Sequence, residues 1–205
     1  MTGASGGIGS EIKSILLEND IEIIELTSKE YDLSSDIVLP EITCDGFIHC
    51  AGINILNKAM DIEDETFFKV FKINTLSFLN ICKQLKFNKK SNIIAIGSLY
   101  SFLIKPERIN YSISKHALLA AVKTMALEMS EQKIKVNMVS PGFVDTKLTR
   151  LNNSQERIEE LDKLVPLGLT NANEIAKICL YLVKENQAIT GQNIVIDGGY
   201  SCLLP

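Results

Sequence analysis

A tyrosine and a lysine four positions apart, Tyr111 and Lys115, are the residues of this sequence best suited to chemistry. Residues at this spacing lie on one face of a helix, so both side chains can reach the same point. A phenol, with a reference pKa of about 10, is a poor acid or base at neutral pH. We expect the nearby ammonium to lower the pKa of Tyr111 and prepare it for proton transfer. Taken alone, the pair also fits two unrelated solvent-exposed side chains.

Ser98 adds a third polar group to this pair. It follows the β-like run Asn92–Ile96 and lies thirteen positions before Tyr111 (111 − 98). Parallel sheets bind ligands at the carboxyl ends of their strands, so the Ser98 hydroxyl is placed to polarise a substrate carbonyl. The three residues together predict proton transfer next to a carbonyl group.

A glycine-rich segment, TGASGGIG at residues 2–9, precedes a helical pattern and then a β-like run. Glycines let backbone N–H groups at a helix N-terminus approach a pyrophosphate, since side chains would hold the phosphates away. A tight turn without a ligand explains this segment alone equally well. A strand normally comes directly before such a loop, and here only Met1 does. We therefore expect the first strand of the sheet to be missing.

The elements that must position these residues alternate along the chain, which is typical of an α/β domain with buried parallel strands. The β-like runs are Ile21–Leu26, Phe47–Cys50, Asn92–Ile96, Lys135–Val139 and Asn193–Ile196. Helices are expected near Ser10–Glu18, Asp64–Leu85, Tyr111–Glu131 and Asn173–Val183, and Thr146–Pro166 is expected to be a mobile flap. The pattern predicts a Rossmann-type doubly wound parallel sheet with helices on both faces, and with the helix and strand after the second strand shortened.

Composition limits the class of protein. The 205 residues, 46% of them hydrophobic, suit a single domain over residues 1–205. A net charge of −4 without a lysine-rich block argues against nucleic acid as a partner. The sequence shows neither a signal peptide nor a membrane-spanning run, so we expect a cytoplasmic protein with no membrane partner. Five widely spaced cysteines without a metal-site pattern are expected to be buried free thiols, and we expect no metal.

Across nearly its whole length the chain resembles the short-chain dehydrogenase/reductase family, and 3-oxoacyl-[acyl-carrier-protein] reductases in particular. The motifs that carry the resemblance are TGASGGIG, Ala51-Gly52, Asn74, Ser98, Tyr111 with Lys115, Pro141-Gly142 and Asp197-Gly198-Gly199. The resemblance implies hydride transfer between a nicotinamide dinucleotide and a carbonyl or alcohol. It implies that Tyr111 is the general acid/base, Ser98 binds the reacting oxygen, and Lys115 holds the nicotinamide ribose. Asn74 would support a proton-relay water.

The same resemblance implies a set of cofactor-binding residues: Gly3, Ser5, Gly7, Ile8, Gly9, Ser28, Asp32, Leu33, Ala51, Gly52, Tyr111, Lys115, Pro141, Gly142, Val144 and Thr146. Thr27 stands where an acid would bind the ribose 2′-OH of NAD, and Ser28 and Lys29 follow it. A hydroxyl and a cation suit a 2′-phosphate better, which favours NADP(H) with NAD as the alternative. The chain departs from the family's Asn-Asn-Ala-Gly at His49-Cys50, and we expect His49 to be structural.

Two functional hypotheses remain open at this stage. The intact set Ser98, Tyr111 and Lys115 favours an active reductase, whereas the missing strand favours a non-catalytic dinucleotide-binding or oligomerising relative. The family implies a homodimer or homotetramer formed through helices 64–85 and 111–131. Specificity is expected in Thr146–Pro166 and after Ser98, at Leu99, Tyr100 and Phe102. No charged cluster stands out there, so a partly apolar substrate is favoured.

Overall fold

A parallel four-stranded sheet forms the centre of the protein. A computed structural model describes residues 1–151 and 153–203. The strands are β1 (Ile42–His49), β2 (Leu85–Ile96), β3 (Lys135–Pro141) and β4 (Asn193–Ile196), adjacent in that order. Because all four run in the same direction, their carboxyl ends meet at one edge. The predicted α/β class is confirmed.

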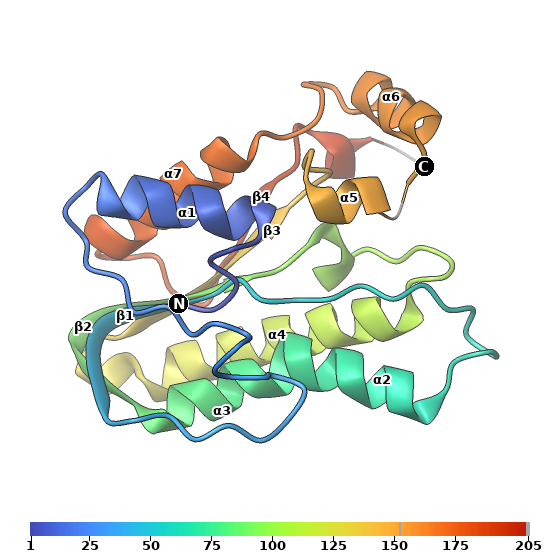
Figure 1. Cartoon of the computed structure of the whole chain (residues 1–205). Helices are drawn as coiled ribbons and strands as arrows, with labels where there is room; N and C mark the ends of the chain where they lie inside the picture. Colours follow the sequence, from blue (N-terminus) through green and yellow to red (C-terminus); the bar gives the residue numbers. More distant parts are fainter. Residues whose placement is uncertain (152, 204–205) are drawn as a thin grey trace.

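Helices cover both faces of this sheet (Figure 1). One face carries α1 (Gly7–Leu17) and α7 (Ala172–Lys184). The other carries α2 (Asp64–Phe71), the π-helix η1 (Lys72–Leu76), α3 (Ser77–Gln84) and α4 (Ile109–Glu128). The helices expected from the sequence pattern agree with these bounds to within three residues.

Alternation along the strands divides the core into two clusters. Side chains of a strand point alternately to opposite faces. Ile93 packs with Phe78 and Leu118 on the α3 and α4 side, whereas its neighbour Ile94 packs with Ile12 and Ile175 on the α1 and α7 side. Both clusters hold β2 in place, and β2 leads directly to Ser98.

Short helices complete the fold. They are η2 (Leu99–Ser101), η3 (Ser130–Gln132), α5 (Lys147–Leu151), α6 (Gln155–Leu164) and η4 (Tyr200–Cys202). All of them except η3, which directly precedes β3, follow the carboxyl end of a strand. The segment Thr146–Pro166, expected to be a mobile flap, contains the helices α5 and α6. The Ser154 side chain caps α6 by accepting from the Arg157 N–H at 3.2 Å, and Ile158 and Leu161 of α6 are buried.

The first strand is reduced to a single bridging residue. Thr2 forms parallel bridges with both Leu26 and His49, and its N–H donates to the Ile48 carbonyl at 3.0 Å. Within the described part of the chain no strand precedes α1, as expected. The predicted strand Ile21–Leu26 is wrong, since only Leu26 makes a bridge there. A strand needs a hydrogen-bonded neighbour along its length, and in this segment Met1 is hydrogen-bonded to Ile24 and Leu26 while Thr2 bridges to Leu26.

The connection from Leu26 to β1 is short and irregular, as expected. Residues 27–41 contain no helix or strand. Leu39 is buried, and its N–H donates to Gln84 Oε1 of α3 at 2.8 Å. Tyr31, Leu33 and Ile37 pack against the same core cluster. This segment therefore covers part of the sheet without adding a strand to it.

Candidate active site

Ser98 is held in a tight turn at the carboxyl end of β2. Its side chain accepts from the Tyr100 N–H at 3.3 Å, while its own N–H donates to Ser101 Oγ at 3.1 Å. This reciprocal capping fixes the start of η2. Ser98 also lies close enough to Tyr111, in the first turn of α4, to lower the pKa of the Tyr111 hydroxyl. The structure thus brings these two predicted residues together.

Lys115 lies one turn further along α4, with only 3% of its surface exposed. Its Nζ is 5.7 Å from the centroid of the Tyr111 ring and donates to the Ile96 carbonyl at 2.8 Å. Burial lowers the pKa of Lys115 to about 8, because the charged form is desolvated. At neutral pH the ammonium is still mostly protonated.

The pKa of Tyr111 differs from the expectation. Burial raises it to about 12, and the Ser98 hydrogen bond and the charge of Arg108 oppose that rise. The expected lowering by Lys115 is wrong for this structure, in which Nζ is turned to the Ile96 carbonyl. Tyr111 is therefore a protonated phenol at neutral pH, ready to donate rather than to accept.

Asn74 sits in the π-helix η1 and joins three parts of the site. Its Oδ1 accepts from the Ile53 N–H at 2.8 Å, and its Nδ2 donates to the Ile53 carbonyl at 2.9 Å and to Ser114 Oγ at 3.0 Å. A Cβ on Gly52 would lie 3.3 Å from Asn74 Oδ1 and 3.6 Å from Lys115 Nζ. Single π turns are frequent at functional sites, and here one holds an amide against Gly52 and α4.

The glycine loop packs closely against two other predicted cofactor segments. Gly3 has φ +69°, and a Cβ there would lie 2.6 Å from the Ala51 nitrogen. A Cβ on Gly9 would lie 2.0 Å from the Gly3 carbonyl oxygen, and one on Gly7 would lie 2.9 Å from Thr146 Cγ2. Only glycine fits these positions, so the loop is fixed between Ala51 and Thr146.

The N-terminus of α1 suits a pyrophosphate. Its N-cap residue, Gly6, supplies no side-chain cap, and the first turn holds no acidic residue. The free N–H groups and the positive end of the helix dipole favour an anion there. Ser5 is exposed and Ile8 is half-buried beside this terminus. The residues present therefore fit a dinucleotide.

The segment after β3 closes the other side of the loop. Pro141 ends β3, and the Gly142 N–H donates to the Ile196 carbonyl at 2.8 Å. Val144 is buried and bridges to Thr170. Thr146 lies next to Gly7 and is hydrogen-bonded to Thr149, with 3.3 Å between the two hydroxyl oxygens.

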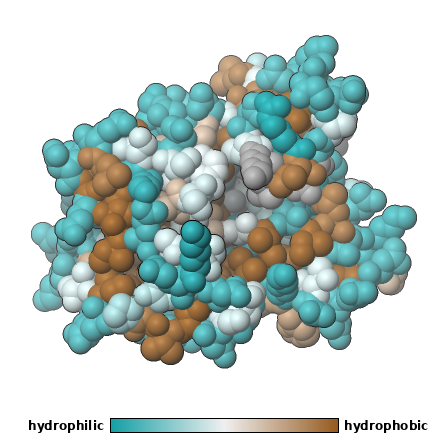
Figure 2. Space-filling view, viewed as in Figure 1, coloured by the Kyte–Doolittle hydropathy of each residue, from teal (hydrophilic) through white to brown (hydrophobic). Residues whose placement is uncertain are grey.

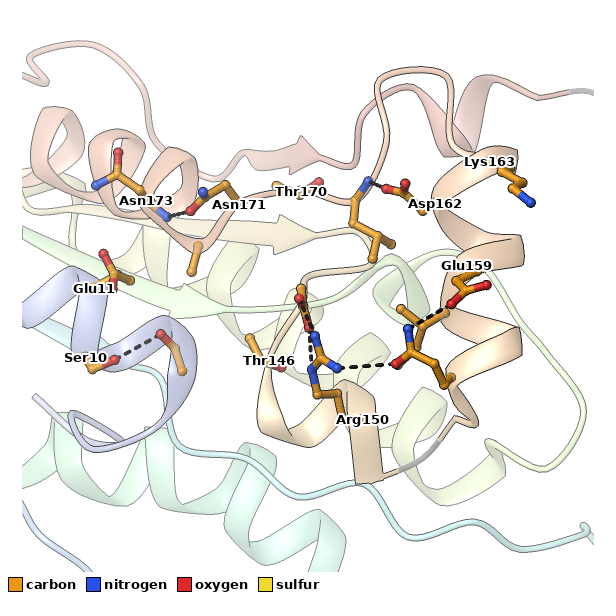
Figure 3. Close-up of a pocket in the computed structure, with 16 residues that line it drawn as sticks. Ser10, Glu11, Thr146, Arg150, Glu159, Asp162, Lys163, Thr170, Asn171 and Asn173 are labelled. Carbon is orange, nitrogen blue, oxygen red and sulfur yellow. Dashed lines mark hydrogen bonds and ion pairs between the residues drawn. The ribbon is translucent and has the colours of Figure 1, made fainter.

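A cavity of about 1170 Å³ opens between the glycine loop, α6 and the start of α7. Gly7, Ser10, Thr146 and Asn171 are among its lining residues. Figure 3 shows Arg150 within it, hydrogen-bonded to Asp145 and Gln155. Ser98, Tyr111 and Lys115 do not line this cavity, which belongs to the phosphate side of the site. In Figure 2 residues of intermediate hydropathy, in white, gather near the middle of the face drawn.

The adenine side holds the remaining predicted residues. Ser28 and Asp32 are exposed, and Asp32 Oδ1 accepts from the N–H and hydroxyl of Ser34 at 2.9 and 2.8 Å. Leu33 packs against the core. Thr27 Oγ1 donates to Glu30 Oε2 at 3.3 Å. The carboxylate of Glu30, which was not among the residues expected to affect the cofactor preference, therefore lies beside Thr27.

His49 is a structural residue rather than a catalytic one. It is fully buried against Phe47 and Phe78, and its Nδ1 is hydrogen-bonded to Thr2 Oγ1 at 3.0 Å. Burial lowers its pKa to about 3, and the charge of Lys115 contributes in the same direction. The ring is therefore neutral at physiological pH. His116, in contrast, is exposed and bonded to the Ser112 carbonyl.

Sequence reasoning missed two residues of the site. Ser114 accepts from Asn74 and donates to the Tyr111 carbonyl at 2.7 Å. Arg108 immediately precedes α4 and acts on Tyr111 through its charge. Ser114 lies three positions after Tyr111 and Arg108 three positions before it. This helical spacing is the feature of the sequence that could have indicated both residues.

Cysteines and metal-binding groups add nothing to this site. All five cysteines are free, as expected, but only Cys179 is fully buried, and Cys202 is exposed. Residues 1–151 and 153–203 contain no cluster of three or more His, Cys, Asp or Glu side chains able to hold a metal ion. No helix among them is long and apolar enough to cross a membrane.

Comparison with known proteins identifies the family. Residues 35–201 match the family model described as Enoyl-(Acyl carrier protein) reductase. The chain belongs to the short-chain dehydrogenase/reductase family. It is 29% identical over 231 residues to the 3-oxoacyl-[acyl-carrier-protein] reductase FabG of Buchnera aphidicola, covering 97% of this chain and 95% of that protein.

Solved structures of this family have the same fold. A short chain dehydrogenase family protein from Francisella tularensis is 27% identical with a TM-score of 0.84, covering 98% of this chain and 97% of that one. A 4-hydroxyisoleucine dehydrogenase complexed with NADH and succinate is 26% identical with a TM-score of 0.79, covering 99% of each chain. This short-chain dehydrogenase/reductase is thus an NAD(P)-dependent oxidoreductase, and its cofactor is a nicotinamide dinucleotide.

Proposed function

We propose that this enzyme transfers a hydride between NADP(H) and a small carbonyl or alcohol substrate, with Tyr111 as the general acid/base. One observation carries the proposal: Ser98, Tyr111 and Lys115 meet at the carboxyl edge of β2, beside Asn74. A non-catalytic relative would have no need to keep these four side chains packed together.

The chemistry follows from the state of each group. When bound, the dinucleotide supplies the hydride that reduces the carbonyl carbon and is itself oxidised. Tyr111, protonated because burial raises its pKa to about 12, donates its proton to the carbonyl oxygen. Ser98 holds that oxygen through its hydroxyl, and the Lys115 ammonium binds the nicotinamide ribose. In alcohol oxidation the same proton returns to Tyr111.

The remaining predicted residues bind the cofactor in this proposal. Gly3, Ser5, Gly7, Ile8 and Gly9 present α1 to the pyrophosphate. The other residues line the two ends of the dinucleotide: Ser28, Asp32 and Leu33 at the adenine, and Ala51, Gly52, Pro141, Gly142, Val144 and Thr146 toward the nicotinamide. Asn74 supports a proton-relay water next to Lys115.

The preference for NADP(H) rests on the exposed residues Thr27, Ser28 and Lys29 after Leu26. A 2′-phosphate brings negative charge that Lys29 can pair with, whereas Glu30 would repel it. Lys29→Gln should weaken NADPH binding and leave NADH binding unchanged. Tighter binding of NADH than of NADPH by the unaltered protein would reverse this part of the proposal.

Titration of the purified protein with NADPH and with NADH tests the proposal directly. Thermal shift and nucleotide fluorescence are suitable readouts, with Tyr111→Phe as a binding-competent control. Saturable binding in both proteins is expected, because the Tyr111 hydroxyl acts on the substrate. A folded protein that binds neither nucleotide would contradict the proposal and leave the non-catalytic alternative.

The substrate and the assembly belong to the same proposal. Family members act on small molecules, and the neighbour solved with NADH also carries succinate, a dicarboxylate.

We propose a homodimer or homotetramer formed through α2–α3 and α4, in a single-domain cytoplasmic protein. Sedimentation velocity of the purified protein would show a dimer or tetramer, and a monomer would overturn that part.

A further inference from the structure

Arg108 is a buried cation beside the catalytic tyrosine, and one nitrogen of its guanidinium has no hydrogen-bond partner. Only 8% of its surface is exposed, and Nη1 is buried with no hydrogen-bond partner. None of the ion pairs among residues 1–151 and 153–203 includes it. A guanidinium keeps its charge at all physiological pH values, and an unpaired buried charge is costly. Such a group calls for an anion that arrives from outside the chain.

The backbone around Arg108 is fixed by neighbouring segments. The Asn57 N–H donates to the Glu107 carbonyl at 3.2 Å, and Asn110 Nδ2 donates to Asn57 Oδ1 at 3.1 Å. The Ser112 N–H donates to the Arg108 carbonyl at 2.7 Å as α4 begins. The guanidinium therefore extends from a preformed helix start, which is how binding groups are held in position before a ligand arrives.

The side chain of Arg108 acts on the reacting centre. Arg108 and Tyr111 lie three positions apart, on one face of the helix start. The rings of Tyr100 and Tyr111 pack edge to face, 6.1 Å apart. Burial raises the pKa of both hydroxyls, and the Arg108 charge opposes the rise in both cases. The Arg108 charge therefore acts on the same tyrosine hydroxyl that would meet a substrate.

The charges of two further cations act on this group of side chains. Lys105 lies before Arg108 in the sequence, and Arg157 lies on α6. Burial lowers the pKa of Lys105, and the charges of Arg157 and Arg108 lower it further. Arg157 has one counter-charge, Glu160, at 2.8 Å, and Glu107 acts on Lys105 in the opposite direction. Positive charge still exceeds negative charge here, and a bound anion would relieve the repulsion.

We propose that Arg108 binds a carboxylate of the substrate, so that this enzyme selects small oxo acids and hydroxy acids over uncharged carbonyl compounds. The planar guanidinium matches a carboxylate through two parallel N–H···O bonds. Arg108 is one helical turn from Tyr111. A substrate that contacts both residues therefore carries its carboxylate only a few bonds from its reacting carbon. This inference rests on the proposed function, and it replaces the partly apolar substrate favoured by the sequence.

Paired substrates test this inference. 2-Oxobutanoate, acetoacetate and 4-oxopentanoate would each be compared with their methyl esters in NADPH- and NADH-dependent reduction. At least one acid should be reduced with a kcat/KM about 30-fold or more above that of its ester, because a buried charge pair is lost in the ester. In Arg108→Gln the ratio of kcat/KM for the acid to kcat/KM for its ester should fall to about 1, and a ratio that stays about 30-fold would contradict the inference.

Succinate binding separates this inference from the proposed function. It would be measured by calorimetry with and without nucleotide, in the unaltered protein, in Arg108→Gln, in Arg108→Lys and in Lys123→Gln, an exposed charge control on α4. Binding should be lost in Arg108→Gln, weakened in Arg108→Lys and retained in Lys123→Gln. Failure of the unaltered protein to bind succinate or any of the three acids would overturn the carboxylate site even if esters are reduced. Succinate binding without any reduction would contradict the proposed function alone.

Discussion

At the scale of single residues, burial controls the charges of this site more than contacts between side chains do. His49 shows the effect most clearly, since its pKa is lowered to about 3 by burial. In the unfolded chain a histidine takes up a proton below about pH 6.5, whereas in the folded protein His49 does not. The unfolded state therefore binds more protons, and stability is lost as the pH falls from about 6.5 toward 3.

This difference predicts an acid-sensitive stability. Between pH 7.5 and pH 5 the His49 contribution should lower the free energy of unfolding by about 2 kcal/mol. His49→Asn lacks the titrating ring and should not show this part of the loss. Urea unfolding of both proteins at the two pH values measures the difference. Parallel losses in the two proteins would show that His49 takes up a proton in the folded state.

Lys115 gives a second pH effect, on activity. Its pKa is lowered to about 8 by burial, so its charge is lost at moderately alkaline pH, while Tyr111, with a pKa near 12, stays protonated. The kcat/KM for carbonyl reduction should therefore fall above about pH 8. Lys115→Arg keeps its charge and should move this fall to higher pH. A profile that stays flat to about pH 10 in the unaltered enzyme would disagree with the role given to Lys115.

At the scale of elements, the glycine loop is positioned by close backbone contacts. Gly9 has no room for a Cβ, which would lie 2.0 Å from the Gly3 oxygen, whereas a Cβ on Gly6 would lie 3.4 Å from the same atom. Gly9→Ala should thus lower stability by about 2 kcal/mol and abolish NADPH binding. Gly6→Ala, the matched control, should remain close to the unaltered protein. Thermal unfolding and nucleotide titration measure both effects, and equal behaviour of the two variants would refute the assigned loop geometry.

At the scale of the whole molecule, stability is expected to be uneven between the middle of the sheet and the segment beside Thr2. Among the described residues no strand pairs with residues 22–25, and Thr2 bridges to Leu26. Their backbone amides should exchange with solvent faster than those of Ile93–Ile96, which lie in the middle of the sheet. Hydrogen exchange followed by mass spectrometry makes this comparison. Equal protection of the two segments would mean that 22–25 belongs to a continuous sheet.

The sequence predicted this architecture well where local pattern and tertiary contacts agree. The runs Asn92–Ile96 and Asn193–Ile196 lie within strands as expected, because each is hydrogen-bonded to β3. Ile21–Leu26 is also rich in isoleucine, but among the described residues it has no neighbouring strand, which depends on residues distant in the sequence. Arg108 could not be predicted as a site residue for a similar reason. Its role depends on its burial beside Tyr100 and Tyr111, which no sequence motif indicates.

The central claim is that Tyr111 donates the proton in carbonyl reduction. The most direct test is steady-state reduction of acetoacetate and of a 3-oxoacyl thioester by the unaltered enzyme and by Tyr111→Phe, at saturating NADPH. We predict that kcat falls about 10²- to 10⁴-fold in the variant while nucleotide affinity is retained, because only the reacting hydroxyl is removed. Tyr111→Phe turnover within a few-fold of the unaltered enzyme would contradict the account.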